Sequence, residues 1–166
     1  GFSSINYDEW PNAIRILLVG MMFFGGCAGS TTGGMKIIRI NIMVKKMVRE
    51  IRVFMRPSAV IHTKLDKKPV ESSIVAQIST FFAIFVLIFA VGSFIMSFFT
   101  PDLETAVSSV VATLGGVGPG LSHVGPMENY AEIPLTGQAF LTFLMLLGRL
   151  ELYTVLVLLL PSFWKK

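Results

Sequence analysis

Apolar residues dominate three long stretches of the chain, and the interruptions between and within them define its organisation. Two stretches, 74–99 and 135–160, are long enough to cross a bilayer as helices, which takes roughly 20 apolar residues. The third, 13–44, crosses only if it tolerates the segment GGCAGSTTGG at residues 25–34. Glycines and hydroxyl residues inside an apolar run predict a helix that unwinds in its middle. The pattern therefore predicts an all-α membrane protein with one broken helix.

Charged residues make up only 14% of the chain and are segregated by position. Lys and Arg gather between the first two apolar stretches and recur in the closing FWKK, whereas residues 1–10 and 100–133 carry Asp and Glu but no Lys or Arg. The positive-inside rule then places residues 45–71 and the C-terminus in the cytoplasm and the acidic segments outside. This position accounts for the basic run without a nucleic-acid ligand. Arg15 lies near the outer end of its apolar stretch, where its side chain is expected to reach the interface.

The segment 100–121, TPDLETAVSSVVATLGGVGPGL, predicts a re-entrant hairpin. Thr100 is the expected N-cap and Pro101 the expected first helical residue. A helix over 101–114 is about 20 Å long, too short to cross a bilayer, and the glycines after it end the helix. An exposed glycine-rich loop is the alternative, but the apolar AVSSVVATL favours entry into the membrane. Carbonyl groups in such a return strand could replace the hydration shell of K⁺.

Four motifs resemble the Trk/Ktr/HKT superfamily of potassium uptake proteins, and most closely its Trk-type membrane subunits. The motifs are GGCAGSTTGGMKIIRI, REIRVFMRPSAV, LGGVGPGL and GRLELYTVLVLLLPSFW. That family builds one pore from four helix, pore-loop, helix repeats of the potassium-channel-like type. The resemblance implies a C-terminal fragment in which 1–56 ends repeat three, 57–71 is a cytoplasmic linker and 72–166 is repeat four. Repeat four would comprise a first helix 72–100, a pore helix 101–114, a filter 115–121 and a second helix 134–162.

The resemblance also implies two groups of site residues. The ion filter would comprise Gly1, Gly116, Val117, Gly118, Pro119 and Gly120, with K⁺ held by the carbonyls of Val117 and Gly118. The gate would comprise Gly25, Gly26, Gly29, Ser30, Thr31, Thr32, Gly33, Gly34 and Arg149.

The broken segment and Arg149 each have a structural alternative. The hydroxyl groups of loop 25–34 can satisfy backbone groups freed by unwinding, so a static kink competes with a movable gate. Arg149 lies mid-way along the last apolar stretch, where an unpaired charge costs several kcal/mol. The family role would be an electrostatic barrier below the filter, and the alternative is capping of carbonyls freed by the glycine break.

These features predict the pore-forming part of a potassium uptake channel or transporter in the cell inner (plasma) membrane. A secondary transporter with discontinuous helices, coupled to Na⁺ or H⁺, is the alternative. The sequence shows no pair of nucleophile and general base, so no enzymatic activity is expected. Cys27 is the only cysteine. No cofactor is expected, and K⁺ is the expected transported ion. The resemblance implies as partners membrane lipid, the remaining repeats, a second copy in a homodimer and a cytosolic nucleotide-binding regulatory ring, but no nucleic acid.

Overall fold

The computed structural model describes residues 3–27, 29–56, 64–65, 68–150, 152–159 and 161–164, and its elements are mostly helical. The helices, in chain order, are α1 (Asn12–Met22), α2 (Ile37–Met55), α3 (Ser72–Met96), α4 (Leu103–Gly115), α5 (Leu135–Arg149), α6 (Leu152–Leu159) and α7 (Pro161–Trp164). Short 3₁₀ turns lie at Tyr7–Glu9 (η1), Ser122–Val124 (η2) and Tyr130–Glu132 (η3). A small antiparallel ladder joins β1 (Lys64–Leu65) to β2 (Lys68–Pro69). The rest of the expected linker 57–71 lies largely outside the described residues.

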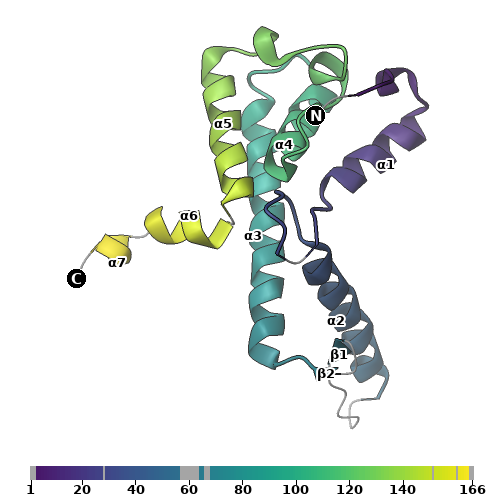
Figure 1. Cartoon of the computed structure of the whole chain (residues 1–166), viewed down its shortest axis with the longest axis vertical. Coiled ribbons are helices and arrows are strands. Elements are labelled where there is room, and N and C mark those ends of the chain that lie inside the picture. The colour runs from purple at the N-terminus through teal and green to yellow at the C-terminus, as the bar shows by residue number, and fades with distance from the viewer. Residues whose placement is uncertain are drawn as a thin grey trace.

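The long helix α3 is the axis on which the other helices are arranged. Among the described residues it is the one helix long and apolar enough to cross a membrane, while α1, α4 and α5 are shorter apolar helices. Figure 1 shows α4 and α5 beside the upper half of α3, and α2 beside its lower half. Apolar side chains remain exposed along these helices, for example Ile16, Leu87 and Phe94. Such an apolar exterior is typical of surfaces that contact lipid or further protein.

Helix α4 is the most deeply buried element and forms the centre of the core. All residues from Ser108 to Gly115 are buried, chiefly against α3 and α5. The main apolar cluster brings Val110 and Leu114 of α4 together with Phe85 of α3 and Leu144 of α5. The buried hydroxyl groups on α4 are satisfied locally, since Ser109 donates to the Ala106 carbonyl at 2.9 Å and Thr113 to the Ser109 carbonyl at 2.7 Å. Helix α4 is thus packed between α3 and α5.

The start of α4 differs from the sequence expectation. Thr100 is not the N-cap, because its hydroxyl donates to the Met96 carbonyl at the end of α3 instead. Asp102 takes the N-cap position with extended backbone, and the helix begins at Leu103 rather than at Pro101. Thr100 therefore completes the preceding helix, which displaces the start of α4 by two positions along the chain.

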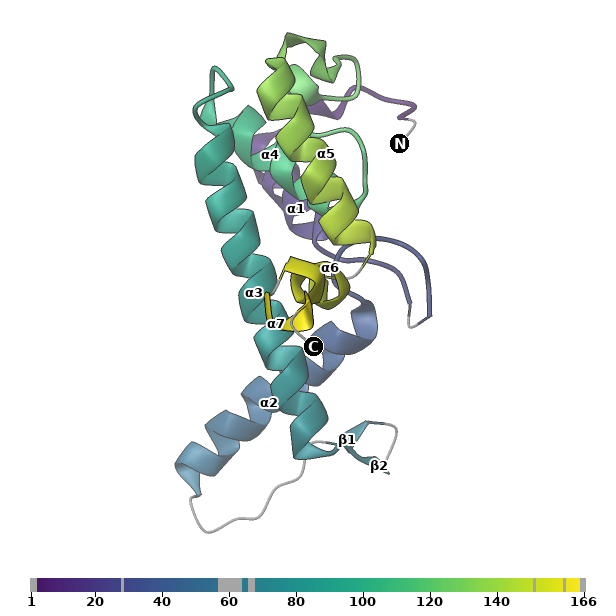
Figure 2. The same cartoon turned by 90° about the vertical axis from the view of Figure 1, so that its left-hand side faces the viewer.

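The last apolar stretch is not one continuous helix, so the expected second helix over 134–162 is wrong. Helix α5 ends at Arg149, and Leu150 leaves the helical conformation with φ −86° and ψ 9°. Figures 1 and 2 show α6 and α7 running away from the line of α5. The new direction is fixed by tertiary contacts, since Leu152 is buried and the Tyr153 hydroxyl donates to the Gln77 carbonyl of α3 at 2.8 Å. Arg149 consequently lies at the end of a helix.

Candidate functional site

The return segment, residues 116–121, leaves the end of α4 and turns back alongside it. Gly116 closes the helix in the left-handed region at φ 68°, and Gly118 has φ 110°, which side-chain-bearing residues rarely adopt. The Leu121 N–H donates to the Ser108 hydroxyl at 3.0 Å, so the end of the segment lies beside the middle of α4. A helix followed by a glycine-dependent return strand is the path that the sequence predicts here.

The carbonyl groups of this segment fall into two sets. The first set accepts internal hydrogen bonds: Gly118 from the Tyr130 hydroxyl at 2.7 Å, and Gly120 from the Tyr7 hydroxyl at 3.1 Å. Leu121 likewise accepts from the Ser108 hydroxyl at 3.2 Å. The second set comprises the carbonyls of Gly116, Val117 and Pro119, which accept no hydrogen bond from any residue that the structure describes. This second set is available to an external ligand.

The two tyrosines anchor the segment and were missed by the sequence reading. Burial, followed by the charge of Tyr7, raises the pKa of the Tyr130 hydroxyl to about 12, so this group remains a hydrogen-bond donor at neutral pH. Gly118 was expected to coordinate K⁺ through its carbonyl, and that oxygen already accepts from Tyr130. No periodicity in the sequence signals these contacts, since Tyr7 and Gly120 are brought together only by the tertiary fold.

The glycine-rich loop, residues 25–34, connects α1 to α2 and is closed at its base by backbone hydrogen bonds. The Gly25 N–H donates to the Met35 carbonyl at 2.8 Å, and the Met35 N–H donates to the Phe23 carbonyl at 3.0 Å. Within the loop, the Thr32 hydroxyl accepts from the Gly26 N–H at 2.8 Å and lies 3.0 Å from the Ser30 hydroxyl. The hydroxyl groups thus satisfy backbone freed by unwinding, as the sequence suggests. Gly29 and Gly34 both have positive φ.

Backbone of the loop reaches the C-terminal end of α4. A methyl group added to Gly33 would lie 2.9 Å from the Gly115 carbonyl oxygen and 3.3 Å from the Gly116 nitrogen. On the other side, a methyl group on Gly148 of α5 would overlap the Leu114 carbonyl oxygen. Glycines from two further segments therefore permit close backbone approach where α4 passes into the return segment. The structure in this way joins the expected gate loop to the expected filter.

Arg149 follows Gly148 directly and is the last residue of α5. Its side chain is exposed and forms no hydrogen bond or ion pair with the other residues that the structure describes. A cation at this position is favourably placed with respect to the negative end of the α5 helix dipole. The charge also lies one residue from the tight contact between α5 and the end of α4.

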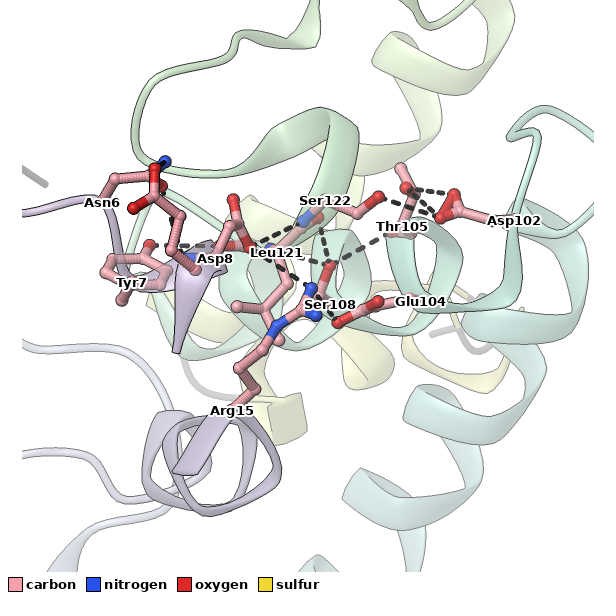
Figure 3. A network of polar contacts seen from close by, with 12 residues as sticks. Asn6, Tyr7, Asp8, Arg15, Asp102, Glu104, Thr105, Ser108, Leu121 and Ser122 are labelled. Atoms are coloured by element: carbon pink, nitrogen blue, oxygen red, sulfur yellow. Dashed lines mark hydrogen bonds and ion pairs between the residues drawn. The ribbon is translucent and has the colours of Figure 1, made fainter. Parts of the chain in front are cut away.

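A polar network joins the N-terminal segment to the start of α4 and the end of the return segment (Figure 3). Arg15 of α1 forms ion pairs with Glu104 at 2.5 Å and with Asp8 at 3.5 Å. Burial raises the pKa of the Asp102 carboxyl, but hydrogen bonds from Thr105 and Ser122 outweigh it and hold the pKa below its ordinary value. The sequence signal that could have revealed this network is a lone arginine in an apolar run facing an entirely acidic exterior.

One expected site position lies outside this picture. Gly1, the expected tail of the preceding filter strand, lies outside the described residues. Among the described residues, no group of His, Cys, Asp and Glu side chains is arranged to hold a metal ion. The candidate site is therefore a backbone site, built from the return segment and the glycines packed against it.

Comparison with known proteins places this arrangement in a transport family. The family model for TrkH, described as a cation transport protein, matches residues 1–166. The Trk system potassium uptake protein TrkH of Halomonas elongata is 41% identical over the whole chain, and that of Escherichia coli K12 is 37% identical over the whole chain. The crystal structure of the potassium transporter TrkH from Vibrio parahaemolyticus superposes with a TM-score of 0.89 over 99% of this chain at 36% identity.

The chain belongs to the TrkH family of cation transport proteins. The family expected from the four sequence motifs is thereby confirmed. The chain spans 34% of the length of the two curated relatives and 35% of the crystallised protein.

Proposed function

We propose that this chain contributes one quarter-ring of carbonyl ligands and an adjacent gate to a K⁺ pathway across the cell inner membrane. The observation that carries the proposal is the division of carbonyls in the return segment. The tyrosine hydroxyls hold Gly118 and Gly120, while Gly116, Val117 and Pro119 keep unpaired oxygens. Carbonyl oxygens arranged around an axis can replace the hydration shell of K⁺. The Val117 carbonyl, which is expected from the sequence as a K⁺ ligand, is among these unpaired carbonyls. The carbonyls of Gly116 and Pro119 are further candidate ligands.

Electrostatics at the end of α4 support the same role. The helix directs its negative end toward the start of the return segment, where a cation is stabilised. The low-dielectric core around Val110 and Leu114 strengthens this field relative to water. Because Tyr7 and Tyr130 fix the carbonyls of Gly120 and Gly118 by hydrogen bonds, the unpaired carbonyls need little reorganisation when an ion arrives.

The glycine-rich loop and Arg149 are proposed as the gate of this pathway. The loop contacts the junction of α4 and the return segment through Gly33, so a change in loop conformation acts directly on the ligand backbone. Its positive-φ glycines at 29 and 34 allow alternative backbone conformations at low cost. Arg149 supplies a positive charge near the same junction.

The rest of the pathway comes from other segments. The chain corresponds to about a third of its relatives, so a closed ring of ligands requires the remaining repeats of the same polypeptide. A homodimer of the membrane part and a cytosolic nucleotide-binding ring are the proposed larger assembly, with residues 45–71 and the C-terminus on the cytoplasmic side.

Flux through the full-length protein in liposomes tests this function. Rubidium or K⁺ uptake down its own gradient is expected without any Na⁺ or proton gradient. Gly118→Ala should lower uptake by about tenfold or more, because alanine at φ 110° is strained and displaces the neighbouring carbonyls. Gly20→Ala is the matched control, since no atom lies within 4 Å of the added methyl group. Normal uptake by the Gly118 variant would contradict the assignment of this segment.

Coupled secondary transport is the second candidate, and the break between α5 and α6 favours it. Together with the loop between α1 and α2, it gives two discontinuous helices near one level, as in many secondary transporters. Uptake that appears only when a Na⁺ or proton gradient is imposed in the same liposomes would support this candidate over a channel-like pathway.

A further inference from the structure

Ser122 is a strained residue immediately after the return segment. Among the described residues it is the one non-glycine with positive φ, at 59°. Backbone in this region is costly for a residue with a side chain and persists where the surroundings hold it in place. Two carboxylates do so here: the Ser122 N–H donates to Asp8 Oδ1 at 3.0 Å, and its hydroxyl donates to Asp102 Oδ2 at 3.0 Å.

The Asp8 carboxylate occupies the space beside Gly125. A side chain at Gly125 would overlap Asp8 Oδ2, so the absence of one there creates room for the carboxylate. The neighbouring Tyr7 hydroxyl donates to the Gly120 carbonyl at 3.1 Å. Two consecutive residues of η1, Tyr7 and Asp8, therefore hydrogen-bond to Gly120 and Ser122 at the end of the return segment, which is far away in sequence. Figure 3 shows Tyr7 and Asp8 both directed toward this strand.

Arg15 contacts the same carboxylate oxygen, Asp8 Oδ1, that accepts from the Ser122 N–H. Its side chain is only 18% exposed, and its guanidinium lies 3.5 Å from Asp8 and 2.5 Å from Glu104 at the start of α4. The arginine thus ties η1 and α1 to the helix from which the return segment departs. The same cation therefore contacts Glu104 of α4 and Asp8, which in turn binds Ser122 at the end of the return segment.

We propose that Asp8 is a positioning residue for ion discrimination, acting through Ser122 on the spacing of the unpaired carbonyls. The inference rests on the proposed K⁺ pathway and extends it to a residue that does not touch the ion. The free carbonyl of Pro119 lies between the two anchored carbonyls of Gly118 and Gly120. The hydrogen bonds of Tyr7 to Gly120 and of Asp8 to Ser122 therefore determine the direction of the Pro119 carbonyl oxygen. If these hydrogen bonds are weakened, the carbonyl ligands can move closer together and coordinate the smaller ion Na⁺.

The test is the ratio of K⁺ to Na⁺ permeation in the full-length protein reconstituted in liposomes. Asp8→Ala is expected to lower this ratio by about tenfold, the effect of losing one charge-assisted hydrogen bond. Asp8→Asn keeps an oxygen that accepts from the Ser122 N–H but loses the charge, so it should lower the ratio by only about two- to threefold. Glu9→Gln is the matched control on the same turn, because the Glu9 side chain accepts a hydrogen bond from Asn6 and from no other described residue.

A ratio rather than a rate separates positioning from simple stability. If Asp8→Ala reduces the amount of folded protein or the total flux and leaves the K⁺ to Na⁺ ratio at the wild-type value, the proposal is overturned. If that variant does not fold, Asp8→Asn decides: a ratio below wild type supports positioning, and an unchanged ratio overturns it. The wild-type flux is measured first. If the wild type shows no K⁺ flux, the proposed K⁺ pathway is contradicted, and the role of Asp8 is not what failed.

Discussion

Arg149→Gln in the full-length protein is expected to raise maximal K⁺ flux by up to roughly a hundredfold. A cation leaving the unpaired carbonyls would pass a fixed positive charge at the end of α5, next to the junction of α4 and the return segment. At about 6 Å and an effective dielectric of about 20, the repulsion is about 3 kcal/mol, which corresponds to roughly a hundredfold in rate. Water in the passage lowers this figure. Glutamine removes the charge and keeps a polar side chain of similar length.

The same assay distinguishes a barrier from a structural cap. Arg149→Lys keeps the charge and should leave flux near the wild-type value. Deleting residues 30–32 of the glycine-rich loop should also raise flux, and in combination with Arg149→Gln the gain should be less than the product of the two. Folded Arg149→Gln protein with equal or lower flux would assign Arg149 to stabilising the end of α5 instead.

Gly148→Ala is expected to destabilise the protein severely. The added methyl group would overlap the Leu114 carbonyl oxygen, a backbone atom that cannot rotate away. Overpacking of this kind typically costs about 1–3 kcal/mol or more, and here it also separates α5 from the end of α4. The fraction of full-length protein that stays monodisperse after heating should fall at a lower temperature than in the wild type.

Gly20→Ala again provides the control, since the added methyl group meets open space on a helix of the same protein. Equal heat resistance of the Gly148 and Gly20 variants would show that α5 moves away from α4 without cost. In that case the tight junction described above would not be a constraint on the fold.

The local chemistry of the sequence foretells much of this arrangement. Glycines at 116 and 118 permit the positive φ found there, so residue type indicates where α4 ends and the chain can turn back. The same holds for the unwound loop 25–34, whose hydroxyls bond its own backbone. These features depend on neighbours in the sequence, which is why the pattern reveals them.

Features fixed by distant contacts were not visible in the sequence. The break after Arg149 interrupts an apolar run without proline, and it depends on the packing of Leu152 and Tyr153 against α3. The tyrosine anchors of the return segment and the pairing of Arg15 with Glu104 likewise join segments far apart in the chain. Such contacts require the tertiary fold to be known before the residues can be paired.

Locating a K⁺ substitute in crystals of the full-length protein tests the central claim most directly. Anomalous diffraction from crystals grown with thallous ion should show a site at direct coordination distance from the carbonyls of Val117 and Pro119. The Gly118 carbonyl should still accept from Tyr130 in that structure. Thallous ion bound elsewhere in the pathway, with these carbonyls turned away from it, would contradict the account.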